Sequence, residues 1–275
     1  MTRPQKTLER VISKSGAGSR NEARSWIHAR RVQVNGKTVE DPDIWIDFAR
    51  DRITLDGKPL VRQKPLYILL YKPTGYITTR KDPEGRPTVY DLIGDVEQFV
   101  SPVGRLDLDT SGLLILTNDT QFAERLTNPD HHIAKTYLVK CSTLLSDEAL
   151  AQLRRGVTLS DGPTRPARVR RVRDSGKYTH LELSITEGRN RQVRRMIEAV
   201  DSKVLKLVRT AIGPVTFGDL QIGKWREMTA DEVAALSGSP TRKRTSGPAP
   251  DRRPPGTKRF PRPRRSSVIN LPGCG

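Results

Sequence analysis

Cysteine is scarce in this sequence. Only two occur among 275 residues, Cys141 and Cys274, and they lie far apart. Two distant thiols can build neither a disulfide framework nor the paired ligand spacing of a zinc site. The four histidines also lack thiolate or carboxylate partners at metal-ligand spacing. We therefore expect a protein of the reducing cytoplasm that holds no metal.

Long apolar runs are absent as well. The longest, residues 66–71, is far too short to span a bilayer, and the first ten residues lack the apolar core of a signal peptide. The chain contains neither a G-x-x-x-x-G-K-[ST] phosphate loop nor a dinucleotide fingerprint. These absences predict no membrane partner and no nucleotide or other cofactor.

Positive charge is abundant. Lys and Arg number 49 against 31 Asp and Glu, which gives a formal net charge of +18 and a pI near 10.3. Such a charge calls for an anionic partner, namely nucleic acid, a membrane surface or an acidic protein. Because the chain has no apolar segment for a membrane, the membrane surface is the weakest of these candidates.

Half of this charge lies in the last 39 residues. Residues 237–275 hold ten Lys or Arg against one acid, Asp251, together with eight prolines and five glycines. A segment of this composition cannot bury enough apolar surface to offset the entropy lost on ordering. We predict a disordered basic tail over 237–275.

Residues 1–61 are predicted to form a small separate module. Leu8, Val11 and Ile12 recur at helical spacing, and Ser19 with Glu22 forms a capping box that starts a second helix. Residues 32–34 and 37–39 flank an Asn-Gly turn, which is typical of a hairpin, and 52–55 adds a strand. The second helix leaves three basic side chains for solvent or for RNA phosphates: Arg20, Arg24 and Arg31.

The stretch SGAGSRNEARSWIHARRVQVNGKTV resembles an S4 domain, an RNA-binding module, over roughly fifty residues. Its S-R-x-x-A and V-x-V-N-G elements have the separation found in that family. This resemblance implies RNA contact and, by itself, no activity.

Residues 62–236 mix strands and helices without regular βαβ alternation, which predicts an α+β domain with a mostly antiparallel sheet. The expected strands are 66–71, 113–117, 136–140, 167–172, 178–185 and 204–209. The expected helices are 121–127, 147–155, 191–200 and 230–236, the last with a Thr229/Glu232 capping box.

The segment GRLDLDTSGLLILTND, residues 104–119, is the most informative part of the chain. If 105–107 is extended, Arg105 and Asp107 project to the same side, and the guanidinium favours the ionised carboxylate. Asp109 is followed by Thr, Ser and Gly, which indicates turn chemistry. In the helix expected over 191–200, Val193, Met196, Ile197 and Val200 form the core face, and we interpret Arg191 as solvated.

Four motifs in order resemble those of pseudouridine synthases. They are K-P-T-G from Lys72, the R-L-D segment around Asp107, K-T-Y from Lys135, and E-G-R-N-R-Q-V-R-R-M from Glu187. With the N-terminal S4-like module, they place the chain nearest to the rRNA synthases that carry an S4 domain. The segment ITTRKDPEGRPTVYDLI, residues 77–93, most resembles the B group of the synthases that modify large-subunit rRNA.

The resemblance implies roles for individual residues. Asp107 is the catalytic acid, Tyr137 packs on the target uracil, and Arg194 forms the ion pair with the acid. Arg105, Lys72 and Lys135 are expected to contact RNA. The target uridine leaves its stack, as enzymes that act on bases require, and its C1′–N1 bond is cleaved before the uracil re-bonds through C5. Asp107 acts either as a nucleophile or by removing a ribose proton, and both alternatives remain open.

The expected partner is ribosomal RNA or a ribosome assembly intermediate, bound by a monomeric protein. Two other classes of function are compatible with the charge: a non-enzymatic rRNA-binding or ribosome-rescue protein, and a nucleoid protein that uses the basic tail. Neither class explains why Asp107, Tyr137 and Arg194 occur in the order found in pseudouridine synthases. In addition, nothing in residues 1–236 resembles a motif that binds the major groove of DNA.

The composition of the tail generates a first prediction. Truncation after Leu236 should lower the affinity for RNA and the association rate, because long-range attraction is lost, but it should leave the modified nucleotide unchanged. Mapping of the modified position with the full-length and truncated proteins checks this. A shifted position after truncation would show that the tail reads sequence or recruits a partner.

Overall fold

The computed structural model describes residues 6–47, 50–61 and 63–238. The predicted basic tail therefore lies outside the described residues, except for its first two. Ser237 is the last residue of the final helix, one position later than expected, and Gly238 caps that helix in the left-handed conformation.

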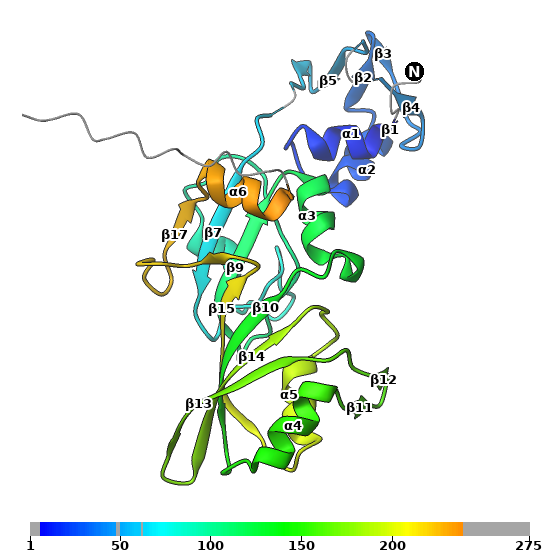
Figure 1. Cartoon of the computed structure of the whole chain (residues 1–275). Helices are drawn as coiled ribbons and strands as arrows, with labels where there is room; N and C mark the ends of the chain where they lie inside the picture. The colour runs from blue at the N-terminus through cyan, green and yellow to red at the C-terminus, as the bar shows by residue number, and fades with distance from the viewer. Residues whose placement is uncertain (1–5, 48–49, 62, 239–275) are drawn as a thin grey trace, which may run out of the picture. The chain divides into compact units, whose positions relative to one another are not determined.

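The N-terminal module has its own hydrophobic core, built by two helices against a small sheet (Figure 1). The predicted capping box is present: Ser19 Oγ accepts from the Glu22 N–H, and the Glu22 carboxylate accepts from the Ser19 N–H at 2.8 Å. Ala23 and Ile27 are fully buried, as expected for the apolar face of the second helix. The elements are α1 (Leu8–Lys14), α2 (Arg20–His28), the sheet β3-β2-β5-β6 (Lys37–Thr38, Val32–Val34, Ile53–Leu55, Lys58–Pro59) and the pair β1 (Lys6–Thr7) with β4 (Trp45–Ile46).

The second domain is built on a nine-stranded sheet, which confirms the predicted α+β class. The strand order is β13-β14-β10-β15-β9-β7-β17, with β16 on β15 and β8 on β9. All pairings are antiparallel except β15 with β9. The strands are β7 (Tyr67–Lys72), β8 (Ser101–Pro102), β9 (Ser111–Thr117), β10 (Lys135–Cys141), β13 (Arg168–Ser175), β14 (Tyr178–Ile185), β15 (Val204–Ile212), β16 (Val215–Thr216) and β17 (Trp225–Glu227).

The helices lie where the sequence places them, within two residues at each end. The remaining elements are α3 (Thr120–Thr127), α4 (Asp147–Arg155), α5 (Gln192–Glu198), α6 (Ala230–Ser237), the 3-10 turns Val89–Leu92 and Pro129–His131, and the hairpin β11 (Thr158–Leu159) with β12 (Gly162–Pro163). The Thr229/Glu232 capping box at the start of α6 is confirmed.

The middle strands β7 and β9 are buried on both faces. Leu69, Leu113 and Ile115 face one core, and Ile68, Leu70 and Leu114 face another on the opposite side. This two-sided burial explains why residues 66–71 and 113–116 are continuous apolar runs rather than alternating ones.

A close approach of two backbones connects the two halves of the sheet. Gly112 of β9 pairs in parallel with Arg209 of β15, and a Cβ at Gly112 would lie 2.2 Å from the Arg209 carbonyl oxygen. Gly112 also has φ of +117°, a conformation that strongly favours glycine. Only glycine fits there, so the segment that precedes β9 is fixed against β15.

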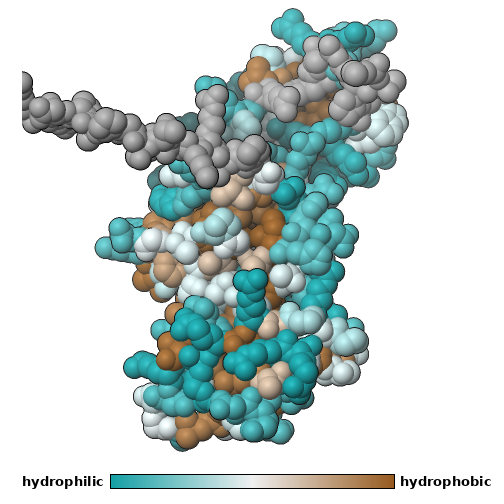
Figure 2. Space-filling view, in the orientation of Figure 1, coloured by the Kyte–Doolittle hydropathy of each residue, from teal (hydrophilic) through white to brown (hydrophobic). Residues whose placement is uncertain are grey.

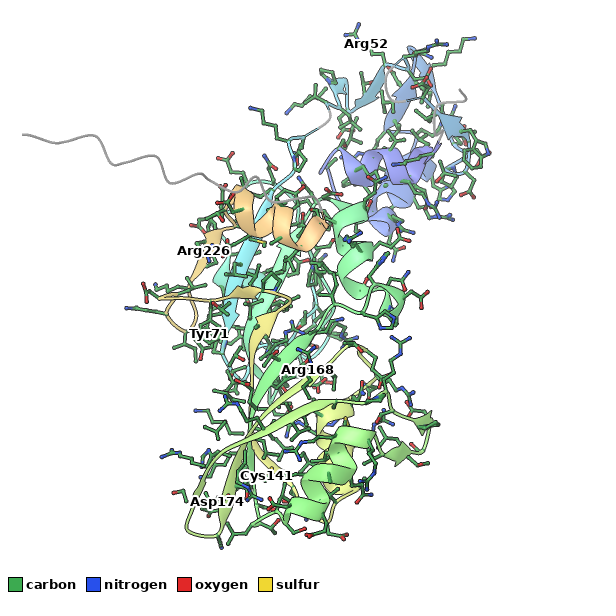
Figure 3. The ribbon with its side chains drawn as sticks, in the orientation of Figure 1. Arg52, Tyr71, Cys141, Arg168, Asp174 and Arg226 are labelled. Carbon is green, nitrogen blue, oxygen red and sulfur yellow. The ribbon has the colours of Figure 1, made fainter. Side chains whose placement is uncertain are left out.

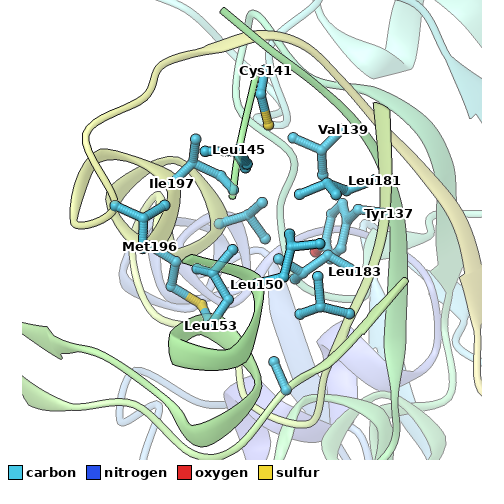
Figure 4. Packing of buried hydrophobic residues seen from close by; sticks show 14 of the residues in the cluster. Tyr137, Val139, Cys141, Leu145, Leu150, Leu153, Leu181, Leu183, Met196 and Ile197 are labelled. Carbon is cyan, nitrogen blue, oxygen red and sulfur yellow. The ribbon is translucent and has the colours of Figure 1, made fainter. Parts of the chain in front are cut away.

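Helices α4 and α5 cover one face of the other half of the sheet, strands β13, β14, β10 and β15 (Figure 1). Figure 4 shows the core between them, in which Tyr137 lies with Leu181, Leu183, Met196 and Ile197. Cys141, labelled in Figures 3 and 4, is buried in the same core. Burial raises the pKa of its thiol to about 12, so Cys141 is an unreactive packing residue.

The face of the molecule shown in Figure 2 is mostly hydrophilic, with hydrophobic residues gathered near α6 and the adjoining strands. Within the described residues, no helix is long and apolar enough to cross a membrane. The same part of the chain contains no group of three or more His, Cys, Asp or Glu side chains that could hold a metal ion.

The separate core of the N-terminal module generates a prediction. Removal of residues 1–60 should leave a domain that melts cooperatively, because the core of the module shares no buried residue with the three clusters of the second domain. The truncated protein should bind RNA more weakly and with a flatter salt dependence, since basic contacts are lost. Melting curves and salt titrations test both parts. Unchanged affinity for structured RNA at physiological salt would show that the module is dispensable.

Candidate active site

A cavity of about 450 Å³ lies where the loop before β9 meets β10, β15 and α5. This volume is typical of sites that hold a small molecule or a single nucleotide-sized group, roughly 300–1,000 Å³. Its walls combine charged and apolar side chains, among them Arg105, Asp107, Lys135, Tyr137, Ile185, Arg191, Val193, Leu207 and Arg209.

The loop that carries Asp107 is held by its backbone. The carbonyl of Leu106 accepts from Thr78 Oγ1 at 2.7 Å, and the carbonyl of Leu108 accepts from the Gly75 N–H at 2.8 Å. The carbonyl of Asp109 accepts from Arg194 Nη2 at 3.1 Å. The two carbonyls that remain, those of Asp107 and Thr110, both accept from one lysine. Every carbonyl from 106 to 110 thus has a donor, which fixes the path of the loop.

That lysine is Lys72, which is fully buried at the end of β7. Its Nζ donates to the carbonyls of Asp107 at 3.0 Å, Thr110 at 2.8 Å and Pro73 at 3.0 Å. The expectation that Lys72 contacts RNA is contradicted, because a side chain with no exposed surface cannot reach a phosphate. Lys72 instead positions the loop, and its three ammonium protons match three carbonyls.

Arg194 also lies behind the loop rather than in the cavity wall. It is 8% exposed, and its Nη2 pairs with Asp109 Oδ2 at 2.9 Å. The expectation that Arg194 pairs with Asp107 is therefore wrong in this structure. Asp109 does occupy a turn, closed by the Thr110 N–H to the Asp107 carbonyl, but the turn interpretation missed this ion pair.

Arg191 is the basic side chain that reaches Asp107. Its Nη1 lies 3.7 Å from Asp107 Oδ2, and its Nη2 lies 3.4 Å from Asp109 Oδ2. Arg191 precedes α5 in the left-handed conformation, with φ of 47°, which is uncommon for a residue other than glycine. The interpretation of Arg191 as a solvated helix side chain is thus corrected: it faces two carboxylates at the cavity, although its side chain is 46% exposed.

Tyr137 enters the cavity from β10. It is 9% exposed, and its ring is supported by the core that Leu181 and Leu183 of β14 complete (Figure 4). On this strand the odd-numbered residues, 137, 139 and 141, are buried, so alternation directs Tyr137 toward α5 and the cavity. A ring held in this way offers a rigid flat surface.

Two further cations line the cavity near Tyr137. Lys135 has a lowered pKa, chiefly because burial disfavours its charge and secondly because of the nearby Arg209 guanidinium. Arg209 is 4% exposed, and its Nε donates to the Leu113 carbonyl at 2.8 Å. Sequence reasoning missed Arg209, because a single arginine inside a strand belongs to none of the motifs. Arg105 also lines the cavity and is exposed.

The loop before α5 is held by Glu187. This carboxylate is 6% exposed and accepts from the Arg165 N–H at 3.0 Å and from Gln192 Nε2. Gln192 in turn accepts from the Arg189 N–H at 3.1 Å through its side-chain oxygen. These bonds set the turn that presents Arg191 and the start of α5 to the cavity.

The three basic residues of the N-terminal module differ in their surroundings. Arg20 is exposed. Arg24 pairs with Glu9 and, at 3.0 Å, with Asp43, and Arg31 pairs with Asp56 at 2.6 Å. Arg31 and Asp56 are both exposed, so their pair is weak and Arg31 can exchange its carboxylate for a phosphate. Arg24 is held more firmly, because its partner Glu9 is only 6% exposed.

A fixed carboxylate, a supported aromatic ring and a group of cations around one nucleotide-sized cavity define an enzyme of the class that acts on nucleic acids. Comparisons with known proteins specify the class further. The family model for RNA pseudouridylate synthase matches residues 66–199, and the S4 domain model matches residues 7–44.

Several curated proteins are similar over most of the chain. An uncharacterized RNA pseudouridine synthase of Aquifex aeolicus is 40% identical over 83% of this chain and 92% of its own length. Ribosomal large subunit pseudouridine synthase B of Bacillus subtilis is 42% identical over 83% of this chain and 94% of its own length. A crystal structure of a pseudouridylate synthase is similar with a TM-score of 0.60 and 32% identity, covering 84% of this chain and 99% of that one.

The chain belongs to the RNA pseudouridine synthase family and has an N-terminal S4 domain. It is therefore an isomerase that acts on RNA, as the four motifs predict.

The buried ammonium of Lys72 generates a pH prediction. Burial lowers its pKa from 10.5 to about 8, against the opposing attraction of Asp107 and Asp109. Below pH 8 the ammonium donates to all three carbonyls, whereas the neutral amine above pH 8 has two protons and can donate to only two of them, which loosens the loop. We expect turnover at saturating RNA to fall as the pH rises through about 8.

Turnover rates from pH 6.5 to 9.5, with RNA binding measured in parallel, test this. The Lys72→Met variant, if its melting curve shows it folded, should be slower throughout and should lack the descending limb. A wild-type profile that is flat across pH 8 would contradict the assignment.

Proposed function

We propose that the chain converts a specific uridine of large-subunit ribosomal RNA to pseudouridine, with Asp107 as the catalytic carboxylate. The observation that carries this proposal is the meeting of Asp107, Tyr137 and Arg191 in one cavity. The five backbone carbonyls of the loop around Asp107 all accept hydrogen bonds, so the backbone that carries the carboxylate is fixed before any substrate arrives. Such preorganisation is how enzymes avoid reorganisation costs during the reaction.

The target uridine must leave its stack for its glycosidic bond to be reached. Tyr137 receives the flipped uracil on its ring. Arg105, which is exposed at the cavity rim, either fills the gap that the flipped uridine leaves in the RNA stack or contacts the RNA phosphate backbone. Lys135 and Arg209 supply positive charge beside the ring, where the phosphates that flank the flipped nucleotide can bind.

Asp107 then starts cleavage of the C1′–N1 bond, either by attack on C1′ or by removal of a ribose proton. The uracil turns within the cavity and forms a new bond from C5 to C1′. The proton on C5 is lost and N1 gains one, so product and substrate are isomers and no co-reactant is required. Arg191 places a positive charge 3.7 Å from the Asp107 carboxylate, and Arg194 acts indirectly by holding Asp109 and the loop.

The apolar part of the cavity protects the intermediate. Ile185, Val193 and Leu207 line it and are each no more than 5% exposed. A dry wall beside the detached sugar prevents hydrolysis, which would otherwise compete with re-attachment.

The choice of large-subunit rRNA over small-subunit rRNA rests on one segment of the sequence. Overall identity does not decide it, because ribosomal large subunit pseudouridine synthase B of Pseudomonas aeruginosa and ribosomal small subunit pseudouridine synthase A of Escherichia coli are both 36% identical. That segment is residues 77–93, whose sequence most resembles the B group of the synthases that modify large-subunit rRNA. The same segment supports the loop that carries Asp107, because Thr78 Oγ1 donates a hydrogen bond to the Leu106 carbonyl. Residues 77–93 are therefore placed to influence the choice of substrate.

We further propose that the S4 domain grips the rRNA through Arg20, Arg24 and Arg31, and that the protein works as a monomer in the cytoplasm, where ribosomes assemble. Mapping of pseudouridine across both rRNAs in a deletion strain, with and without the cloned gene, identifies the target. Loss confined to one small-subunit position would overturn the choice of large-subunit rRNA.

The sharpest prediction concerns Asp107. The Asp107→Asn variant keeps the shape of the side chain but removes its charge, and an amide is neither a competent nucleophile nor a base. Pseudouridine formation should fall below detection while folding and rRNA binding persist. Single-turnover assays with equilibrium binding measure both.

Asp109→Asn is the matched control, with the same chemical change two residues away. It weakens the pairs with Arg194 and Arg191 but leaves the loop carbonyls bonded, so turnover should drop by no more than about tenfold, or about 1.4 kcal/mol. Normal turnover by Asp107→Asn would refute the catalytic assignment. Full activity of both variants would make the chain an RNA-binding protein with the fold of an enzyme.

A further inference from the structure

The four strands β13, β14, β10 and β15 have a second face, opposite to the one that α4 and α5 cover. Successive side chains along a strand point to opposite faces of the sheet. Val139, Leu181 and Leu207 are buried in the core on the covered face, whereas Leu138, next to Val139 in the chain, points to the other face and is 42% exposed. Residues of this second face include the Thr136 and Ser184 hydroxyls, which bond across strands at 2.8 Å. We refer to it as the open face.

Basic side chains dominate the open face. The registers place one row across all four strands, in the order Arg173, His180, Lys140 and Lys206. Arg168 and Arg170 of β13 lie opposite Ser184 and Glu182 in the neighbouring rows. Arg168 and Asp174, labelled in Figure 3, mark the two ends of β13. The open face therefore carries five Lys or Arg and one carboxylate, Glu182.

Little within the described chain neutralises this charge. Glu182 pairs with Arg170 at 3.2 Å. Asp174 bonds Thr179 at 2.8 Å and pairs with Arg171 at 2.9 Å, and Thr179 is buried on the core side. Among the residues that the structure describes, no ion pair involves Arg168, Arg173, Lys140 or Lys206. Lys140 lies over the Tyr178 ring at 4.1 Å, which orients its ammonium without neutralising it.

The pairing of Lys140 with Lys206 is unfavourable for the sheet. These residues are directly opposite in the antiparallel β10–β15 register, and like charges at such positions destabilise a sheet. An anion outside the protein would relieve that repulsion. With strands about 4.8 Å apart, the row of four spans about 14 Å, which suits a run of phosphates rather than a single small ion.

We propose that the open face is a second RNA-binding surface, which holds the phosphate backbone of a segment of the substrate away from the target uridine. The proposal rests on the proposed function for the identity of the RNA. Tyr137 faces the cavity and its neighbour Leu138 faces the open side, so the two surfaces lie on opposite sides of the same strands. A large folded RNA can contact both, whereas a short stem-loop engages mainly the cavity.

The test compares two double variants with the same change of charge. Lys140→Gln with Lys206→Gln neutralises the middle of the row. Arg155→Gln with Lys203→Gln, at two exposed positions outside the row, is the control. Binding to a long rRNA fragment and to an isolated stem-loop is measured between 50 and 200 mM salt, and melting curves confirm folding.

Each lost phosphate contact lowers the slope of log K against log salt by roughly 0.7–0.9. The Lys140/Lys206 variant should therefore lose about 1.5 from the slope and about tenfold in affinity for the long fragment, with a much smaller loss for the stem-loop. The control should resemble the wild type, and Lys140→Arg with Lys206→Arg should restore binding.

Equal slopes for the two double variants, or equal losses on both RNAs, would overturn the proposal. This readout is independent of catalysis. A wild-type protein that converts no uridine would refute the proposed function, while the salt slopes would still decide whether the open face binds RNA.

Discussion

The active site depends on one buried charge. The ammonium of Lys72 has no exposed surface, and burial of an unpaired cation would be very unfavourable. Its three hydrogen bonds to carbonyls offset that cost only while the loop from Asp107 to Thr110 keeps its present path. Movement of the loop would remove two of its three acceptors and leave only the Pro73 carbonyl, so Lys72 strongly favours the present position of the Asp107 backbone.

The parallel pairing of β9 with β15 is the second constraint on the active site. The cavity needs Asp107 from the loop that precedes β9 and Tyr137 from β10, on the other side of the β9–β15 pairing. Gly112 allows the backbone of β9 to lie against Arg209, and the Arg209 side chain then bonds the Leu113 carbonyl at 2.8 Å. These contacts help to join the two parts of the sheet beside the cavity.

Much of the fold could be predicted from the sequence. Strand β14 and helix α4 have the expected bounds, because alternation and capping residues mark both ends. Short strands such as β16 and β17 were missed, because two or three residues are too few to show the alternation of apolar and polar side chains that marks a strand. Their pairing depends on partners far away in the chain.

The site was predictable in its members but not in its contacts. Asp107 and Tyr137 line one cavity, as motif order implies, although their catalytic roles remain predictions. Which arginine meets which carboxylate depends on the left-handed backbone of Arg191 and on the depth at which Arg194 is buried. Neither property leaves a signal in sequence spacing. The same holds for Lys72, whose burial follows from its place at the end of a strand that is covered on both faces.

The way in which the loop is anchored also bears on how the family can change. The hydrogen bonds that hold residues 106–110 are accepted by main-chain oxygens, which every amino acid possesses. A side chain on the outside of the loop, such as Leu108 at 41% exposure, can therefore be exchanged without displacing the carboxylate beside it. Selection of a new RNA site and conservation of the reaction are separable in this architecture, so new target preferences can evolve while the chemistry stays the same.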